Sequence, residues 1–412
     1  MLNSYGFSQV NTIVALCAAA NFINAADRVI MPTAIIPMSQ QFKWSLHGQG
    51  WILSSFSVGY MASGILGASA AKRYGGKFTL LVAVLLWSLS TFITPYFADS
   101  LWKLIGLRVL LGIGEGLGLP TIFHIFSHAI GAEHRSTAFG YLIACGSIGQ
   151  TLSSIICPHL DWKWMFYAFG SLGFIWCILW LLFYIDINPA SIQEYEEQFE
   201  DPSKSSSSLL SHWREFVQHW ALWSLYIAHF TMNWSNYIVM HWLPTYMKAS
   251  LNAEHRDIMY TAAPYILNSI TGVAAGHVAD RLISQYRWPI LKVRRLMTGI
   301  GLIGPGVLML WFSVIDNLML ALFCVTISMG LSACNSAGHL SNHADVAPNF
   351  AGTTFAISNT LATIPGILCG PLTAELVTQS GNRWFPVFII AAFMNFLGGI
   401  IYLGHSSDTA IL

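Results

Sequence analysis

The feature that most constrains the fold is a series of twelve long apolar stretches along the 412 residues. A membrane-spanning helix needs about 20 mostly apolar residues, because its backbone polar groups must be hydrogen-bonded within the segment. The chain is 55% hydrophobic and 9% charged, whereas a soluble domain is about 25% charged. We therefore predict an all-α membrane protein with twelve transmembrane helices, at 13–38, 51–71, 78–98, 104–130, 138–157, 164–185, 222–247, 259–279, 296–314, 318–340, 352–377 and 384–403.

A polar segment divides these stretches into two sets of six. It carries several acidic residues and the run KSSSS, a composition typical of a flexible linker. Its last part, LLSHWREFVQHW, spaces large apolar residues along one helical face, which predicts an interfacial helix. The predicted organisation is an N-terminal six-helix half over 1–187, a cytoplasmic linker with an interfacial helix over 188–220, and a C-terminal six-helix half over 221–412.

The distribution of basic residues indicates the orientation. An even number of spans places both termini on one side of the membrane. If that side is the cytoplasm, eleven of the 19 lysines and arginines lie in cytoplasmic segments, six in the opposite loops and two within the membrane. The positive-inside rule therefore favours cytoplasmic termini in an integral, multi-pass membrane protein. The same pattern leaves the plasma membrane and organelle membranes both open, and the net charge of zero does not suggest nucleic-acid binding.

Two arginines, Arg28 and Arg108, lie inside apolar stretches. A charge at the centre of a bilayer costs about 2.5–3.5 kcal/mol on insertion scales, so such a residue usually faces the bundle interior or a wet cavity. Few carboxylates lie near these two cations in the sequence. The pair therefore suggests a binding site for an anion.

Glu115 follows Arg108 by seven residues on the same predicted helix. Two helical turns place both residues on one face about 10 Å apart along the axis, too far for contact but close enough to flank one cavity. Because desolvation favours the neutral form of a carboxyl group, Glu115 is a candidate proton carrier. An ion pair with a distant helix is the alternative. For Arg28 the alternative is a local pair with Asp27, although adjacent helical residues do not face each other.

Two basic loops lie in corresponding positions of the two halves. The first reads GASAAKRYGGK from Gly67, and the second reads GHVADRLIS from Gly276, followed by KVRR. Weak internal symmetry of this kind is expected when two halves rock around a site at the membrane midplane. The alternative is that the basic loops only set the topology.

These features together resemble the major facilitator superfamily. More narrowly, the chain resembles the anion transporter family that includes sialin, the vesicular glutamate and nucleotide transporters, the sodium–phosphate cotransporters and the plant plastid-type phosphate transporters. The resemblance covers about 21–403 and is carried by an ordered set of motifs: DRVIMPTAIIPMSQQFKW, SSFSVGYM, RYGGK, RVLLGIGEGLGLP, EHRS, WKWMFYAFGSLGFIW, AHFTMNW, HWLPTYM, VADRLIS with KVRR, and SNHADVAPNFAGTTFAISNTLATIPGI. It implies two pseudo-symmetric six-helix halves.

The resemblance also implies residue roles. Arg28 and Arg108 match arginines of the family. The resemblance assigns Arg108 and Glu115 to anion binding and proton coupling. Tyr60 and Tyr237 match tyrosines that line the pocket in relatives. A tyrosine can donate a hydrogen bond to an oxyanion without adding charge. Packing or contact with the membrane interface is the alternative role for both tyrosines.

His343 matches a histidine of the family in the motif NHADVAP. Because histidine changes charge near neutral pH, we consider a role in coupling or in gating the inner end. A hydrogen-bonded structural histidine is an equal alternative. The 14 histidines and seven cysteines show no spacing typical of a metal site, and we expect neither a metal nor a cofactor.

The chain departs from parts of the family at three positions. Met232 stands where the glutamate transporters carry a further arginine, and Leu119 stands where they carry a tyrosine. Leu111 stands where sialin has a second carboxylate. The predicted pocket is thus less cationic than a glutamate site and lacks the paired acids of sialin. This favours transporters of phosphate or phosphorylated metabolites.

The leading hypothesis is a secondary active transporter of inorganic or organic anions that works by alternating access, coupled to protons, sodium or membrane potential. Its expected partners are a small anionic substrate, a coupling ion and the lipid bilayer. A monomer suffices, because twelve helices enclose their own site. A transporter-like receptor or nutrient sensor with little flux is the second hypothesis. The sequence contains no nucleophile elbow, metal triad or phosphate loop that would suggest an enzyme.

Overall fold

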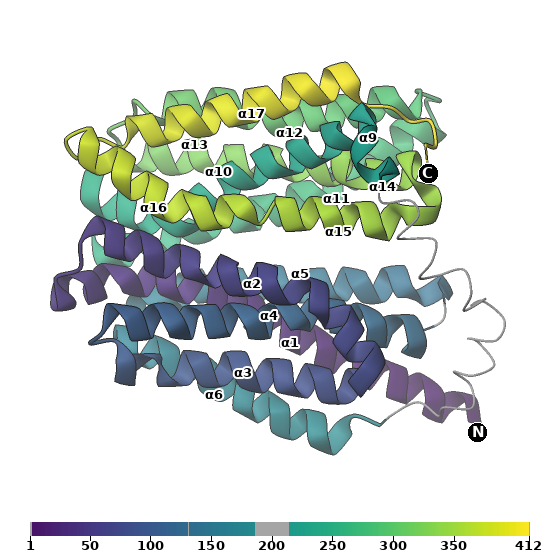
Figure 1. Cartoon of the computed structure of the whole chain (residues 1–412), viewed down its shortest axis with the longest axis horizontal. Coiled ribbons are helices and arrows are strands. Elements are labelled where there is room, and N and C mark those ends of the chain that lie inside the picture. The colour runs from purple at the N-terminus through teal and green to yellow at the C-terminus, as the bar shows by residue number, and fades with distance from the viewer. Residues whose placement is uncertain (1, 131, 186–213, 412) are drawn as a thin grey trace.

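The computed structural model describes residues 2–130, 132–185 and 214–411, and these ranges are helical without a strand (Figure 1). The first half consists of long helices that run up and down beside one another. They are α1 (Leu2–Phe42), α2 (Leu46–Tyr74), α3 (Gly76–Phe97), α4 (Leu101–Ala129), α5 (Ala132–Ile156) and α6 (Trp162–Phe183), with the 3₁₀ helix η1 (Cys157–His159) between α5 and α6.

The second half repeats this arrangement beside the first (Figure 1). Its elements are α9 (Glu215–Gln218), α10 (Trp220–Ser250), η2 (His255–Thr261), α11 (Ala262–Ser284), α12 (Ile290–Phe312), α13 (Leu318–Ser332), η3 (Ala333–Ser336), α14 (His339–Val346), η4 (Pro348–Phe350), α15 (Ala351–Leu361), α16 (Ile364–Gln379) and α17 (Phe385–His405). Both ends of the described chain lie at the same end of the bundle.

Nine helical segments of the described chain are long and apolar enough to cross a membrane. Helices α2, α10 and α11 have comparable lengths of 29, 31 and 23 residues but carry more polar side chains. The nine apolar segments and these three helices together make up the twelve predicted spans. Two spans are interrupted: α13 continues through η3 into α14, and α15 gives way to α16 at Ala362 and Thr363. Pro365 stands in the first turn of α16, where its missing N–H has no intrahelical partner to lose.

The pattern of helix contacts is the same in the two halves. In the first half α4 packs against α2 and α3, and α6 packs against α1 and α3. In the second half α13 packs against α11 and α12, and α17 packs against α10 and α12. These contacts match when α10 to α17 are taken as the repeat of α1 to α6. The internal symmetry indicated by the paired loops is therefore present throughout the helical packing.

Glycines allow α4 to approach two neighbours closely. A Cβ atom on Gly112 or Gly116 would collide with backbone atoms of α2, and one on Gly114 would come within 2.9 Å of the backbone of Trp87 in α3. Residues four apart share a helix face. Gly112 and Gly116 therefore form the face toward α2, while Gly114 faces α3. This close packing fixes the orientation of α4, and with it the positions of Arg108 and Glu115.

The two halves meet at the end of the bundle opposite the termini. There the first part of α2 contacts α16, α1 contacts α10, and the connection η1 contacts η2. Ser54 accepts a hydrogen bond from the backbone N–H of Gly370 at 3.0 Å, and the His47 ring lies 2.6 Å from the carboxylate of Glu375. Each pair joins one residue from each half. We call this region the closed end.

The hydrophobic cores confirm that the contact is confined to one end. One buried cluster contains residues of both halves, including Met38 of α1, Ile52 of α2 and Trp242 of α10. The remaining clusters each belong to one half: one extends from Ile13 to Tyr184, and two lie in the second half. Toward the termini, therefore, the halves have separate cores.

The predicted interfacial helix is described only in part, because 186–213 lie outside the described residues. From Arg214 the chain forms the four-residue helix α9, and the extended conformation of His219 separates it from α10. The buried ring of Phe216 lies 5.7 Å from the ring of Phe350, in an edge contact. Trp220 is exposed and begins α10. In this part, then, Phe216 and Trp220 do not share one continuous helix face.

Candidate functional site

An ion pair joins two of the predicted residues. Arg28 of α1 donates from Nε to Oε2 of Glu115 in α4 at 2.9 Å. The Glu115 side chain is fully buried, whereas Arg28 is 23% exposed. The alternative considered for Glu115, a pair with a distant helix, is therefore what the structure contains. Because the second oxygen, Oε1, has no hydrogen-bond partner, Glu115 retains an unused acceptor.

Aromatic rings of α2 hold the two arginines close together. The guanidinium of Arg28 lies 5.3 Å from the ring centre of Phe56 and 4.9 Å from that of Tyr60. The guanidinium of Arg108 lies 5.5 Å from the same Phe56 ring. A cation over an aromatic face is stabilised by the ring quadrupole, most strongly where water is excluded. Phe56 thus contacts both cations and helps to stabilise them at one site.

Arg108 is only 6% exposed, and its Nε has no hydrogen-bond partner. It interacts electrostatically with Glu115 and Asp27. Asp27 is also buried and accepts a hydrogen bond from Thr91 of α3 at 3.3 Å, with its other oxygen unpaired. The local pair of Asp27 with Arg28 is not formed, as expected for adjacent residues. The site therefore contains a second buried carboxylate that the predicted set had left out.

The second half contributes α10 to the same site. Tyr237 interacts electrostatically with Arg28, and its ring centre lies 5.4 Å from that of His241 one turn along the helix. A Cβ atom on Gly366 of α16 would come within 2.8 Å of the Tyr237 ring and would also collide with the Ser57 hydroxyl. A glycine is required there because α2, α10 and α16 converge. Both predicted tyrosines, Tyr60 and Tyr237, are therefore beside Arg28.

His343 lies in a different group, within the second half. Its Nδ1 is 3.1 Å from the Thr354 hydroxyl. One of its ring nitrogens is therefore hydrogen-bonded, as the alternative of a structural histidine predicts. His229 bonds Ser358 at 2.9 Å in the same way, and the ring centre of His229 lies 5.9 Å from that of His339. These contacts tie α10, α14 and α15 together. The structure does not bring His343 into contact with the arginines.

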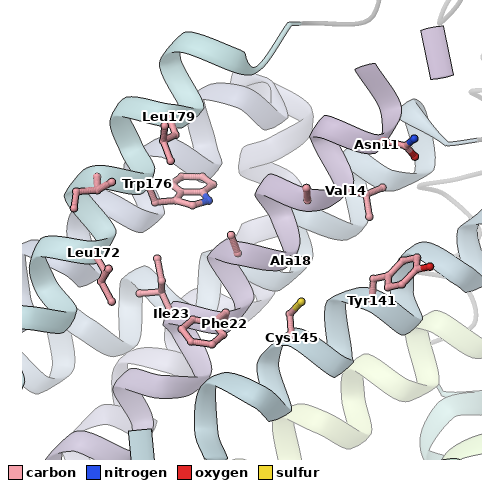
Figure 2. Close-up of a pocket in the computed structure, with 13 residues that line it drawn as sticks. Asn11, Val14, Ala18, Phe22, Ile23, Tyr141, Cys145, Leu172, Trp176 and Leu179 are labelled. Atoms are coloured by element: carbon pink, nitrogen blue, oxygen red, sulfur yellow. The ribbon is translucent and has the colours of Figure 1, made fainter. Parts of the chain in front are cut away.

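A further cavity of about 640 Å³ lies between α1, α5 and α6 (Figure 2). Its walls include Phe22, Leu172 and Trp176, and polar groups enter chiefly from Asn11 and Tyr141. Neither arginine lines it. An apolar cavity cannot hold a small anion, so it is separate from the candidate site. Across the described residues, no group of three histidine, cysteine, aspartate or glutamate side chains is arranged to hold a metal ion.

Sequence reasoning missed three members of the site: Asp27, Phe56 and His241. Asp27 carried a signal, since it is a second carboxylate within an apolar stretch. Phe56 carried none, because one phenylalanine in a membrane helix is indistinguishable from the others. His241 was one of several histidines near the membrane. Only the fold distinguishes it from the histidines that are hydrogen-bonded within one half.

The model of the Major Facilitator Superfamily matches residues 17–368. Sialin of Homo sapiens is 34% identical over 378 residues, covering 88% of this chain and 76% of the relative. The Ascorbate transporter, chloroplastic, of Arabidopsis thaliana is 32% identical over 97% of this chain and 75% of the relative. The Sodium-dependent phosphate transport protein 1, chloroplastic, of the same plant is 32% identical over 97% and 80%.

Solved structures show the same fold. A bacterial homologue of the human lysosomal transporter Spinster, in an inward-facing and occupied conformation, superposes with a TM-score of 0.78 at 14% identity, covering 96% of this chain and 97% of that one. The D-xylose-proton symporter gives 0.74 at 14% identity, covering 98% and 99%. Twelve spans in two matching halves agree with these folds, and the family model covers most of the chain. This chain therefore belongs to the Major Facilitator Superfamily.

Proposed function

We propose that this protein is a secondary active transporter of small anions, with its substrate site between the halves at Arg28 and Arg108. By family it is a transporter rather than an enzyme, and transporters of this superfamily work by alternating access. The observation that carries the proposal is the presence of two arginines from different helices, Arg108 buried and Arg28 23% exposed, beside polar atoms without partners. Relatives named as sialin and as phosphate and ascorbate transporters support an anionic substrate.

The charges of the site suggest how transport is coupled. Two arginines and the carboxylates of Asp27 and Glu115 sum to zero when all four are ionised. A monovalent anion would leave one net negative charge in a site of low dielectric constant, which is costly. One proton on a carboxylate would restore neutrality. We therefore propose proton coupling through Glu115, whose ion pair with Arg28 would weaken on protonation; sodium or membrane potential remains the alternative driving force.

The other predicted residues keep secondary roles in this proposal. Tyr60 and Tyr237 stand beside Arg28, where their hydroxyl groups would donate to the anion without adding charge. His343 would act at a distance by holding α14 to α15 near the end that carries the termini. The cytoplasm would lie at that end, in keeping with the basic loops. Because all these residues belong to one chain, a monomer would be sufficient.

The test is uptake into liposomes that contain the purified protein. Radiolabelled phosphate, ascorbate, sialic acid and glutamate would be offered in turn under a proton gradient, a sodium gradient or a voltage. We expect uptake of one anion class, and we expect Arg108→Gln to lower it at least about tenfold, since a hydrogen bond to a charged group contributes about 1.5–3 kcal/mol. Arg383→Gln, an exposed arginine between α16 and α17, is the matched control. Unchanged uptake by R108Q would contradict the assigned site.

A further inference from the structure

Two polar side chains one turn apart on α10 have buried atoms without a hydrogen-bond partner. His241 is 3% exposed, and its Nδ1 has no hydrogen-bond partner. Thr245 follows one turn later, is 8% exposed, and its hydroxyl is also unpaired. Residues four apart lie on one helix face. The second half therefore presents two unsatisfied hydrogen-bonding groups in a row.

His241 lies near an unsatisfied cation of the first half. Phe56 lies beside Arg108, and the next residue, Ser57, meets Tyr237 of α10 at Gly366. The His241 ring lies one turn from Tyr237, and Arg108 acts on it electrostatically. The Nε of Arg108 is itself unpaired and buried. Arg28 differs from Arg108, because its Nε donates a hydrogen bond to Glu115. Arg108 and His241 thus each offer a buried nitrogen without a hydrogen-bond partner, one from each half.

Buried polar groups without partners are rare, since each loses its hydrogen bonds to water. They persist where a ligand or an ordered water supplies the missing bond. A single water can accept from the guanidinium and the imidazole N–H together, but it brings no negative charge to balance Arg108. An oxyanion has several acceptor oxygens and would bring a negative charge directly to the unpaired Nε of Arg108. The unpaired nitrogens of Arg108 and His241 therefore fit an oxyanion better than a water molecule.

We propose that His241 is an anion-binding residue of the second half, whose ring N–H donates to the same oxyanion that Arg108 binds. This inference rests on the proposed transport function and specifies its site. The ligand would be a compact oxyanion group, either a free phosphate or the phosphate or carboxylate of a small metabolite. Because α4 and α10 belong to different halves, the bound anion would bridge them. Tyr237 would hold the imidazole in place through its ring contact.

The test compares two substitutions at one position. His241→Phe keeps an aromatic ring but removes the N–H donor, whereas His241→Gln keeps an N–H donor on a flexible side chain of similar length. His277→Phe is the control, because His277 is an exposed histidine on α11. For each protein, the KM for phosphate and ascorbate is measured in proteoliposomes. The increase in thermal unfolding temperature on adding the same anions is measured in detergent.

We expect H241F to raise KM about tenfold or more, equivalent to about 1.4 kcal/mol, and to abolish thermal stabilisation by the anion. H241Q should recover most of both, and H277F should match the wild type. Unfolding temperatures without the anion report whether each variant is folded.

An unchanged KM and stabilisation in folded H241F, while R108Q loses both, would overturn the role of His241 alone. Failure of the wild type to bind or transport any anion would overturn the proposed function as well. Stabilisation that depends on His241 without transport would support the site and contradict the transport function.

Discussion

Gly50 of α2 and Gly370 of α16 pack backbone against backbone at the closed end. A Cβ atom on Gly50 would come within 2.5 Å of the Gly370 carbonyl oxygen, and one on Gly370 would collide with the backbone of Gly50. Ser54 fixes the same contact through its hydrogen bond from the Gly370 N–H. The exposed pair of His47 and Glu375 adds little, since water and salt screen the attraction between surface charges. Close backbone packing is therefore what closes this end, and alternating access requires it to separate.

The first prediction concerns this contact. Gly370→Val places a branched side chain where no space exists, so we expect the closed end to remain open and uptake to fall at least about tenfold. The native Cys369 reports the change, because it is almost fully buried in the closed form. Its labelling by a maleimide, quantified by mass spectrometry, should become faster in G370V.

Gly106→Val is the matched control, because nothing lies within 4 Å of a Cβ atom at Gly106. Equal labelling of Cys369 in G370V and the wild type would show that this contact does not control closure.

Much of this architecture could be predicted from the sequence, and the reason is physical. Apolar stretches of membrane-spanning length leave little choice but helices, and the position of the polar segment divides them equally. The arginines at 28 and 108 were identifiable because charge inside the membrane is costly. In each of these cases the signal lies in the local sequence.

The partners of those residues could not be predicted in the same way. Arg28 and Glu115 are 87 residues apart, and only the packing of α1 against α4 brings them together. The environment of Asp27 depends on Thr91, which belongs to a third helix. The electrostatic effect of Arg108 on His241 depends on how the halves meet. Contacts between helices therefore decided which of the candidate residues form one site.

The second prediction tests the coupling role of Glu115. Glu115→Gln keeps a similar shape and an oxygen that can accept from Arg28, but it cannot bind or release a proton. We expect uptake driven by a proton gradient to fall to the background level, while exchange of labelled for unlabelled anion persists. Both are measured in the same proteoliposome preparation, so exchange serves as the control for folding. Proton-driven uptake at the wild-type rate in E115Q would assign coupling to another group.

The third prediction separates Asp27 from Glu115. Asp27→Asn retains a side-chain oxygen for the hydrogen bond from Thr91 and removes one negative charge from the neighbourhood of Arg108. Because like charge no longer opposes the substrate, we expect a KM several-fold lower than in the wild type. Asp99→Asn, an exposed residue between α3 and α4, is the control. A KM that does not decrease in D27N would mean that Asp27 carries no charge when the anion binds.

The last prediction concerns the packing that holds the cation site in place. Gly116 lies against Tyr60, where an added Cβ atom would be 2.7 Å from the carbonyl oxygen and would also collide with the Ser63 hydroxyl. Gly116→Val must push α2 away from α4, and overpacking of this kind typically costs about 1–3 kcal/mol. We expect a lower unfolding temperature in detergent and a higher KM, because Tyr60 moves with α2. Gly140→Val, with nothing within 4 Å of its Cβ position, should leave both unchanged. If G116V lowers stability without changing KM, the position of α2 does not determine the geometry of the anion site, and the aromatic contacts of Arg28 are structural only.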